Sequence, residues 1–456
     1  MRSMEGKRMK IVMLPYVSHG HISPYLEFAK QLSKRNCFNI YICSTPINLA
    51  SIKNRVDDGK DDDVRLVELH LPSSEELPPH FHSSNGLPSH LKPNLHRALE
   101  MAAPGFTEIL KTINPDLVIY DFQPTWPAQV ALSLNIPAVF FATTAAANFC
   151  LFLFFCKNPD EDSPFPEIYV RNSENPPTER SHPVIRNMVL CFERSTDLVL
   201  VKSCREVEGK YIDHLSSVLA TKKVIPVGPL VEEDPTEAVE DDKKINEIIK
   251  WLDKKNESSV VFVCFGSENY LFGEQVTEMA NALESSKCNF IWAVRSPKGE
   301  QKGSSSLQLL PQGFVERVGD MGLVIEGWAP QKMILRHSST GGFLSHCGWN
   351  SMNESIKYGV PIIGMPITGD QPSNARIAVA TGFGMQIVRN IAEGIYKKDE
   401  ICDVIRKVMV DESGQSVRKK AKELSLKIEE KGDEYIDKAV EALLQIFRKN
   451  KETNQL

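Results

Sequence analysis

The sequence lacks several features that mark common classes of protein. Its ten cysteines are scattered singly with no Cys-x-x-Cys pair, which argues against a zinc site and against a disulfide framework. The net charge is −6, so a nucleic-acid partner is not expected. The most apolar run, Phe149–Cys156, is far too short to span a bilayer. No Gly-x-Gly-x-x-Gly follows the first apolar strand, which disfavours a dinucleotide-binding enzyme.

The chain instead has the length and the alternating strand and helix patterns of a two-domain α/β protein. Its 456 residues are too many for one ordinary core, and short β-branched runs alternate with helical patterns, which predicts parallel sheets covered by helices. The composition changes to an acidic stretch after Val227–Leu230, which indicates a linker. We therefore expect an N-terminal Rossmann-like domain over 1–235 and a C-terminal one over 246–432. A final helix at about 433–448 is expected to pack back on the first domain.

Strands are expected wherever such an apolar run is bounded by turn residues. The predicted strands are Lys10–Tyr16, Asn39–Ser44, Arg65–Leu71, Asp116–Asp121, Ala138–Thr143, Asp197–Lys202, Ser259–Gly266, Asn289–Arg295, Gly322–Gly327, Gly341–Ser345, Pro361–Met365 and Met385–Val388.

The start of the chain and the unpaired cysteines predict a location. Met1–Lys10 is short and basic and runs directly into the first strand, so no signal peptide is expected. Single cysteines suit a reducing compartment. We expect a cytoplasmic protein without a transmembrane segment that acts as a monomer.

The most informative stretch lies between Trp328 and Gln371. An aromatic residue opens it, a strand leads into the Gly-rich turn His346–Ser351, and Asp370–Gln371 closes it. This stretch resembles the nucleotide-sugar box of plant family 1 glycosyltransferases. The resemblance implies the GT-B fold, in which two Rossmann-like domains face each other across a cleft. It also implies a UDP-sugar donor, a small-molecule acceptor, no cofactor and no metal.

The resemblance implies a role for each donor-site residue, and several of these roles have a structural alternative. Trp328 would stack on uracil, with Gln331 at the uracil and ribose region, or Trp328 would simply pack at a domain edge. Asn350 would lie at the diphosphate or would cap the following helix. Glu354 would hold the ribose hydroxyls or would complete a capping box with Ser351. The full set implied to bind UDP-sugar is Thr143, Ser267, Trp328, Ala329, Gln331, His346, Trp349, Asn350, Ser351, Glu354, Asp370 and Gln371.

The last residues of the box indicate which sugar is transferred. The resemblance places Asp370, Gln371 and Trp349 on the transferred sugar, and a Gln at this position accompanies glucose more often than galactose. Ile367–Gly369 and Asn353 depart from the commoner pattern of the family. Glucose is therefore the expected sugar.

Candidate catalytic residues follow strands of the first half. His21, in the context Gly-His-x-x-Pro, matches the family's catalytic base, whereas His19 does not. A hydroxyl needs a base to remove its proton, and an imidazole near a helix N-terminus is kept neutral for that purpose. Asp121 ends a strand and would orient the imidazole, or would cap the next helix. Thr143 corresponds to a hydroxyl near the donor sugar or phosphate.

One acidic motif points to different chemistry. Asp61–Asp63 spells the Asp-x-Asp of metal-dependent transferases, but it lies in a loop rich in aspartate. We interpret it as solvated charge.

The remaining sequence narrows the acceptor. Several stretches, among them Cys43–Lys53 and Arg205–Ser216, resemble the plant clade that extends sugar chains on terpenoid, apocarotenoid and flavonoid glycosides. The leading hypothesis is an inverting, UDP-glucose-dependent enzyme that adds β-glucose to a sugar hydroxyl of a plant glycoside, with a triterpenoid saponin as the expected acceptor. The alternatives are transfer to an aglycone hydroxyl and a non-catalytic nucleotide-sugar-binding protein.

Overall fold

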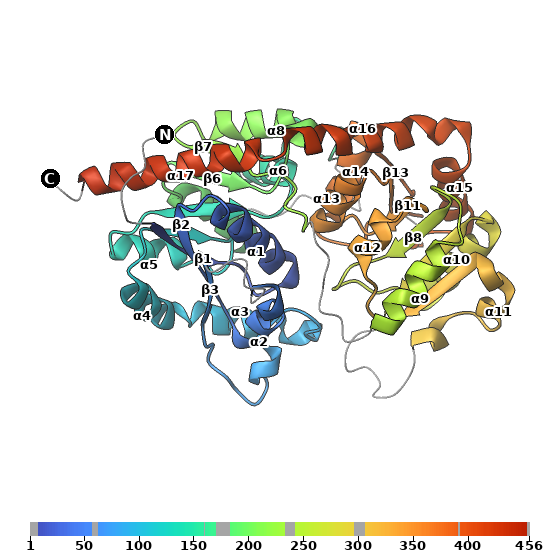
Figure 1. Ribbon diagram of the computed structural model, residues 1–456, viewed down its shortest axis with the longest axis horizontal. Helices are drawn as coiled ribbons and strands as arrows, with labels where there is room; N and C mark the ends of the chain where they lie inside the picture. The colour runs from blue at the N-terminus through green and yellow to red at the C-terminus, as the bar shows by residue number, and fades with distance from the viewer. Residues whose placement is uncertain are drawn as a thin grey trace. The chain divides into compact units, whose positions relative to one another are not determined.

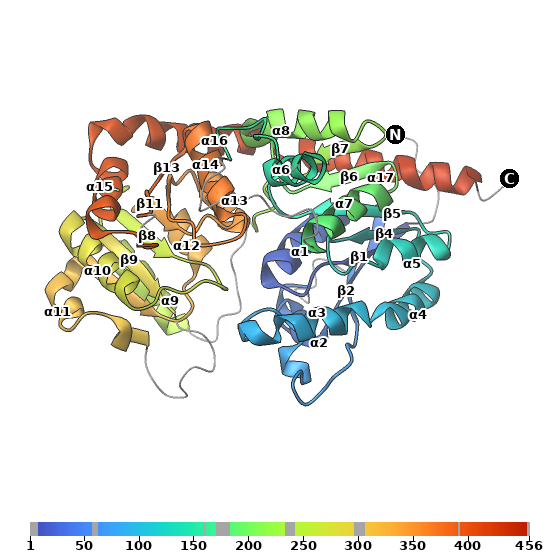
Figure 2. The same ribbon diagram turned by 180° about the vertical axis from the view of Figure 1, so that it is seen from behind.

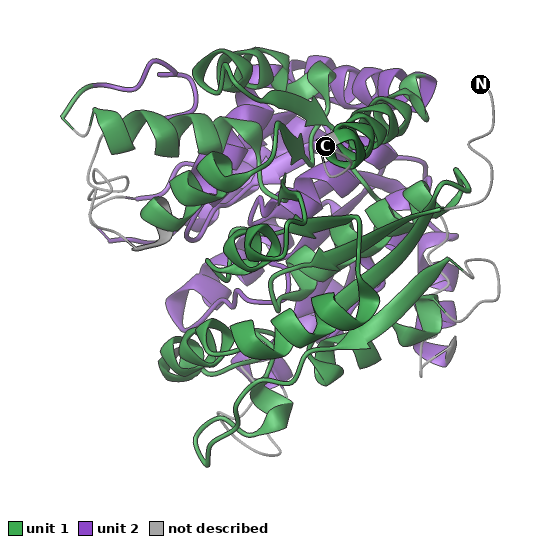
Figure 3. Cartoon of the chain, turned by 90° about the vertical axis from the view of Figure 1, so that its left-hand side faces the viewer, with its two compact units in different colours: residues 1–161, 178–232, 431–456 green, residues 162–177, 233–430 purple. Residues whose placement is uncertain are grey.

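The structure is a computed structural model that describes residues 8–56, 63–158, 160–169, 183–232, 242–295, 306–390 and 393–453. The chain divides into two compact units (Figure 3). The first comprises residues 1–161, 178–232 and 431–456, and the second comprises 162–177 and 233–430. Of the described residues, 162–169 are therefore grouped with the second unit.

The first unit is built on a parallel sheet whose strand order is β3-β2-β1-β4-β5-β6-β7 (Figure 1). Its strands are β1 (Met9–Leu14), β2 (Phe38–Ser44), β3 (Val64–Glu68), β4 (Leu117–Tyr120), β5 (Ala138–Ala142), β6 (Leu198–Val201) and β7 (Lys223–Pro226). Its helices are α1 (His19–Ser33), α2 (Pro46–Ala50), α3 (Lys92–Glu100), α4 (Ala103–Ile113), α5 (Pro127–Ser133), α6 (Ala146–Lys157), α7 (Pro183–Arg194), α8 (Arg205–Val218) and α17 (Glu434–Thr453).

Alternate side chains of the central strands enter two different cores, because successive residues of a strand point to opposite faces. On one face, Ile119 and Phe141 pack against residues of α1 and α17. On the other face, the Phe140 ring meets those of Phe149 on α6 and Phe192 on α7. Every residue of β4, β5 and β6 is buried, as expected for parallel strands covered on both faces.

Helix α17 brings the end of the chain back to the first unit, where it lies beside β7 near the C-terminus (Figure 2) and also contacts α1. Its apolar face, which includes Leu443 and Phe447, belongs to the core beneath α1. The Tyr435 hydroxyl accepts the Arg205 N–H at 2.9 Å and donates to Glu206 Oε2 at 2.6 Å.

The second unit repeats this architecture with a parallel sheet of order β10-β9-β8-β11-β12-β13. Its strands are β8 (Val260–Cys264), β9 (Asn289–Val294), β10 (Gly322–Glu326), β11 (Thr340–Ser345), β12 (Ile362–Gly364) and β13 (Gly384–Gln386). Its helices are α9 (Asp242–Leu252), α10 (Glu274–Ser286), α11 (Phe314–Val318), α12 (Gln331–Arg336), α13 (Trp349–Tyr358), α14 (Gln371–Thr381), α15 (Lys398–Met409) and α16 (Gln415–Lys431). Buried side chains of β8, β9, α10 and α15 form its core.

Each predicted strand coincides with a strand of the structure within a few residues at each end. The sequence analysis did not predict β7, because Lys223–Pro226 is short, begins with a charged residue and ends with proline. The predicted Asp-x-Asp loop lies mostly outside the described residues. Its last member, Asp63, accepts a hydrogen bond from the Arg8 guanidinium.

A buried carboxylate from α8 caps the N-terminus of α6. The N-cap residue of α6 is Ala145, which has no side chain able to bond the free N–H groups there. Glu208 replaces it, accepting from the Ala146 and Ala147 N–H groups at 3.0 and 2.9 Å and from the Ser203 hydroxyl at 2.6 Å. Burial nonetheless raises the pKa of Glu208 from its ordinary 4.5 to about 7.

This shift predicts a pH-dependent stability. Because the folded pKa of Glu208 is raised, the group's contribution is fully present below 4.5 and is lost as the pH rises through about 7. Glu208→Gln removes the titration, so the wild type should lose stability relative to the variant over this range, by on the order of 3 kcal/mol. Urea denaturation of both proteins across the range measures the difference. A constant difference would contradict the assignment.

Candidate active site

His21 lies where the first sheet changes direction. It follows β1 in the first turn of α1, which begins at His19, so both histidines are helical and not in a preceding loop. Strand order reverses between β1 and β4, and ligands of such sheets bind beyond the carboxyl ends of the strands at this reversal. Asp121 follows β4 directly and therefore meets His21 there.

The Asp121 carboxylate determines which ring nitrogen of His21 carries the proton. His21 Nδ1 lies 2.8 Å from Asp121 Oδ2, and Asp121 is buried. The same carboxylate accepts the Tyr16 N–H at 3.2 Å and the Phe122 N–H at 2.8 Å. A carboxylate in this position requires a proton on Nδ1, so the lone pair of the neutral imidazole resides on Nε2.

Thr143 joins this pair. It follows β5, and its hydroxyl oxygen lies 2.8 Å from His21 Nδ1, the nitrogen that faces Asp121. The resemblance implied a hydroxyl near the donor sugar or phosphate, and the structure gives this hydroxyl an imidazole partner within its own unit. His19, in contrast, has an exposed side chain.

Aromatic residues that the sequence analysis did not single out surround His21. The Tyr16 ring meets the imidazole edge to face with centroids 5.4 Å apart, and the Phe122 ring lies at the same distance. The Tyr16 hydroxyl lies 3.1 Å from His96 Nε2. Tyr16 and Phe122 each neighbour a strand end that the sequence had located, so their positions beside His21 could have been anticipated.

The second unit places His346 at its own reversal of strand order, between β8 and β11. His346 follows β11 and is enclosed by two glycines. A Cβ on Gly266 would approach its Cε1 to 2.6 Å, and a Cβ on Gly348 would approach its Nε2 to 2.5 Å. Burial without a counter-charge lowers the pKa of His346 to about 4, so the imidazole is neutral near neutral pH. Ser267 lies next to Gly266 and is partly buried.

Contacts at α13 decide between the alternatives for its first residues. The N-cap of α13 is Gly348, which has no side chain, so neither Asn350 nor Ser351 is the cap residue. Ser351 is already helical, so Ser351 and Glu354 do not form a capping box. Glu354 Oε2 instead accepts the Gln331 amide at 2.6 Å, and Ser351 Oγ lies 3.2 Å from the same amide nitrogen.

Trp328 has the exposure that a stacking residue needs. The residue is 44% exposed just after β10, whereas the neighbouring Ala329 is buried. Lys244 on α9 supports this turn by donating to the carbonyl oxygens of Glu326 and Trp328 at 2.8 and 3.3 Å. The sequence analysis did not identify Lys244, because α9 and the turn are remote in sequence.

Asp370 and Gln371 stand where α14 begins. Gln371 Oε1 accepts the N–H groups of Ile367 and Thr368 at 2.9 and 3.0 Å. Its amide N–H groups are thereby directed away from that turn, while Asp370 Oδ2 accepts from Asn374 at 3.2 Å. A carboxylate and an amide donor side by side can bind sugar hydroxyls.

The buried Trp349 is held within its own helix. Asn353, unusual for the family, donates to the Trp349 carbonyl at 2.7 Å.

Two family models match the chain almost end to end. The model described as glycosyltransferase, N-terminal domain, matches residues 7–232, and the model described as UDP-glucuronosyl and UDP-glucosyl transferase matches residues 226–449. The chain is also 55% identical to UDP-glucosyltransferase 29 of Panax ginseng over 98% of its length and 99% of that relative. The chain belongs to the plant family 1 UDP-glycosyltransferases.

Other relatives of this UDP-glycosyltransferase have more specific names. It is 45% identical to mogroside IIIx synthase of Siraitia grosvenorii, over 96% of this chain and 93% of the relative. It is 44% identical to beta-D-glucosyl crocetin beta-1,6-glucosyltransferase of Gardenia jasminoides, over 95% and 98%.

A solved structure of a family member confirms the fold class. A transferase of Siraitia grosvenorii in complex with UDP aligns with a TM-score of 0.76 at 26% identity, over 97% of this chain and all of that one. The predicted GT-B class, with two parallel α/β domains, is therefore correct. Within the described residues, no helix is both long and apolar enough to cross a membrane.

The packing of His346 predicts the effect of filling the space beside it. In Gly266→Ala, the new Cβ would displace the imidazole, and UDP affinity should fall about tenfold or more, the effect of losing one hydrogen bond to a charged group. Isothermal titration with UDP measures the loss.

A matched control separates this collision from backbone strain. Gly266 has φ +72° and Gly394 has φ +70°, but a Cβ on Gly394 meets nothing within 4 Å. Gly394→Ala should therefore keep the affinity of the wild type. Equal losses in the two variants would show that strain, and not His346, is responsible.

Proposed function

We propose that this UDP-glycosyltransferase transfers glucose from UDP-glucose to a sugar hydroxyl of a small plant glycoside, with a triterpenoid saponin as the foremost acceptor class. The observation that carries the proposal is the His21–Asp121 pair, in which Nδ1 faces the carboxylate and the lone pair that can accept a proton lies on Nε2. The names of the relatives support the substrate class, since one acts on a glucosyl crocetin and another makes a mogroside.

In the proposed reaction, His21 Nε2 removes the proton of the acceptor hydroxyl as that oxygen attacks the anomeric carbon. The new glycosidic bond forms opposite the UDP, so an α-linked donor yields a β-glucoside. The bond from the anomeric carbon to UDP breaks, and its electron pair leaves on the β-phosphate oxygen. Asp121 stabilises the imidazolium that results, and its contacts with two backbone N–H groups keep it in place.

Thr143 has a positioning role in this proposal. Its hydroxyl oxygen and Asp121 Oδ2 both lie 2.8 Å from His21 Nδ1, so the two residues limit rotation of the ring from the same side. A ring so held presents Nε2 in one direction. Thr143 therefore acts through His21, in addition to the contact with the donor that the resemblance implies.

The second unit has the groups that UDP requires. Trp328 offers an exposed face for uracil, and Glu354, oriented by Gln331, offers a carboxylate to the ribose hydroxyls. Neutral His346 can donate an N–H to the diphosphate, and the N-terminus of α13 adds its partial positive charge. These groups stabilise the charge that develops on the departing UDP.

Recognition of the sugar rests on the turn before α14. Asp370 can accept hydrogen bonds from the sugar hydroxyls, whereas Gln371 can donate them, because its oxygen already binds the backbone of Ile367 and Thr368. A hydrogen-bond donor at this position favours UDP-glucose as the sugar substrate. In the family, a Gln here also accompanies glucose more often than galactose.

Substrate choice provides the first test. With UDP-glucose, we expect a product that is one hexose heavier from triterpenoid glycosides and little product from their aglycones. Competition with UDP-galactose, UDP-xylose and UDP-glucuronate should favour glucose. Mass spectrometry with linkage analysis identifies each product. Faster turnover of aglycones would replace the proposal with transfer to an aglycone hydroxyl, and preference for another sugar would refute the role of Gln371.

The catalytic assignment predicts a graded series. His21→Ala should lower kcat by about 10²–10⁴ while UDP still binds, because the donor groups belong to the other unit. Asp121→Asn should also be severe, since the amide cannot stabilise the imidazolium. His19→Ala, which alters the exposed neighbour, should be much milder. The base is misassigned if His19→Ala abolishes turnover and His21→Ala does not.

Thr143 extends this series. Thr143→Val removes the hydroxyl but retains the shape, and it should lower kcat and shift the pH profile of kcat/KM. Thr143→Ser should restore both. A residue that only binds the donor would instead raise the KM for UDP-glucose and leave the pH profile unchanged.

A further inference from the structure

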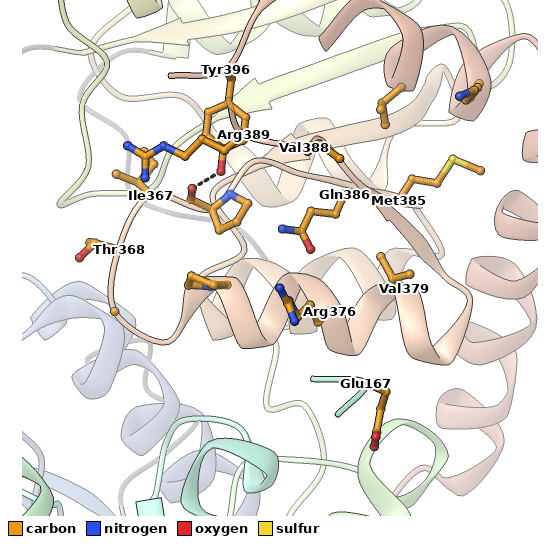
Figure 4. A pocket seen from close by; sticks show the side chains of 15 residues that line it. Glu167, Ile367, Thr368, Arg376, Val379, Met385, Gln386, Val388, Arg389 and Tyr396 are labelled. Atoms are coloured by element: carbon orange, nitrogen blue, oxygen red, sulfur yellow. Dashed lines mark hydrogen bonds between the residues drawn. The ribbon is translucent and has the colours of Figure 1, made fainter. Parts of the chain in front are cut away.

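The second unit contains an open pocket that none of the proposed catalytic steps uses. Its volume is about 770 Å³, in the range of sites that hold small organic molecules. The turn Pro366–Gly369, helix α14, and residues of and after β13 form its walls (Figure 4).

Much of the pocket lining is apolar. Ile367, Met385 and Val404 line it, together with Val379 and Val388, which are 48% and 67% exposed. Large aliphatic side chains of neighbouring elements that remain exposed around one cavity suit contact with an apolar molecule.

Cationic side chains stand among these apolar ones. Arg376 projects from α14 into the pocket, and its guanidinium forms no hydrogen bond or ion pair with any described residue. Arg389 donates to the Gly394 carbonyl at 2.7 Å and lies 5.8 Å from the centre of the Tyr396 ring, again without a described carboxylate partner.

The other charged residues of the lining are Lys407, which pairs with Asp403 at 2.6 Å, and Glu167. Of the lining residues described, only Glu167 bears a carboxylate, so two guanidinium groups face one acid.

We propose that this pocket binds an amphipathic organic anion, in which a rigid apolar body carries one carboxylate. The carboxylate would bind the Arg376 guanidinium, which is suited to a planar, two-oxygen partner, and the body would cover the aliphatic residues. A purely apolar ligand would leave Arg376 without a partner, and an inorganic anion would leave the apolar lining uncovered.

The pocket shares a wall with the proposed sugar site. The turn Pro366–Gly369 lines the pocket on one side and, on the other, is bound by Gln371 through the N–H groups of Ile367 and Thr368. The Tyr396 hydroxyl donates a hydrogen bond to the Pro366 carbonyl of the same turn at 2.5 Å. A ligand in the pocket therefore contacts the segment that positions Gln371. This coupling, unlike the binding itself, rests on the proposed role of Gln371.

Binding of dehydroabietate, a tricyclic carboxylate with no hydroxyl group, tests the proposal on the full-length protein by isothermal titration. The wild type should bind the acid at least about tenfold more tightly than its neutral methyl ester, since a charge-assisted hydrogen bond is lost in the ester. Arg376→Gln should lose about tenfold in affinity for the acid and be unchanged for the ester.

Two further variants keep the test interpretable. Arg336→Gln removes an exposed arginine of α12 in the same unit and should bind the acid as the wild type does. Val388→Gln should weaken both the acid and the ester, because it replaces apolar lining. Equal binding of acid and ester, or an unchanged affinity in Arg376→Gln, would overturn the proposal.

Competition experiments locate the ligand. Saturating UDP should leave the acid bound, and mutual displacement would place the acid in the donor site and overturn the proposal. In turnover assays, the acid should change the KM for UDP-glucose in the wild type and not in Arg376→Gln. Binding without this change would overturn the coupling through Gln371 and leave the second site standing. Turnover by the wild type without the acid tests the proposed function separately.

Discussion

The reversal of strand order within each parallel sheet is the constraint on which both candidate sites depend. At the reversal, the connections after the two central strands leave toward opposite faces of the sheet, so the carboxyl ends of those strands remain accessible. In the first unit this brings His21 after β1 against Asp121 after β4, although 100 residues separate them. In the second unit it brings Gly266 after β8 against His346 after β11.

The two histidines illustrate how different surroundings suit one side chain to different chemistry. His346 is buried between glycines and has no counter-charge, so its pKa falls to about 4 and it can serve as a neutral donor. His21 faces a buried carboxylate, which fixes its tautomer and can stabilise the positive charge formed when Nε2 takes a proton. Burial keeps His346 neutral, whereas the hydrogen bond to Asp121 determines the tautomer of His21.

Much of the fold could be predicted because its strands are short, apolar and β-branched and stand between helical patterns. The strand β7 escaped prediction because Lys223 and Pro226 weaken that pattern within four residues.

The sequence by itself determined the family, the fold class and the donor box, because the box is one continuous strand, turn and helix whose spacing can be read along the chain. Only the tertiary structure decided between roles that the spacing left open. It joined Glu354 to Gln331 and not to a capping box, placed the Thr143 hydroxyl on His21, and left Arg376 without an ion-pair partner among the described residues. Each of these outcomes depends on which strands are neighbours in a sheet and which side chains then lie within hydrogen-bonding distance. That pairing is a property of the folded chain, because the free energy of long-range packing selects it.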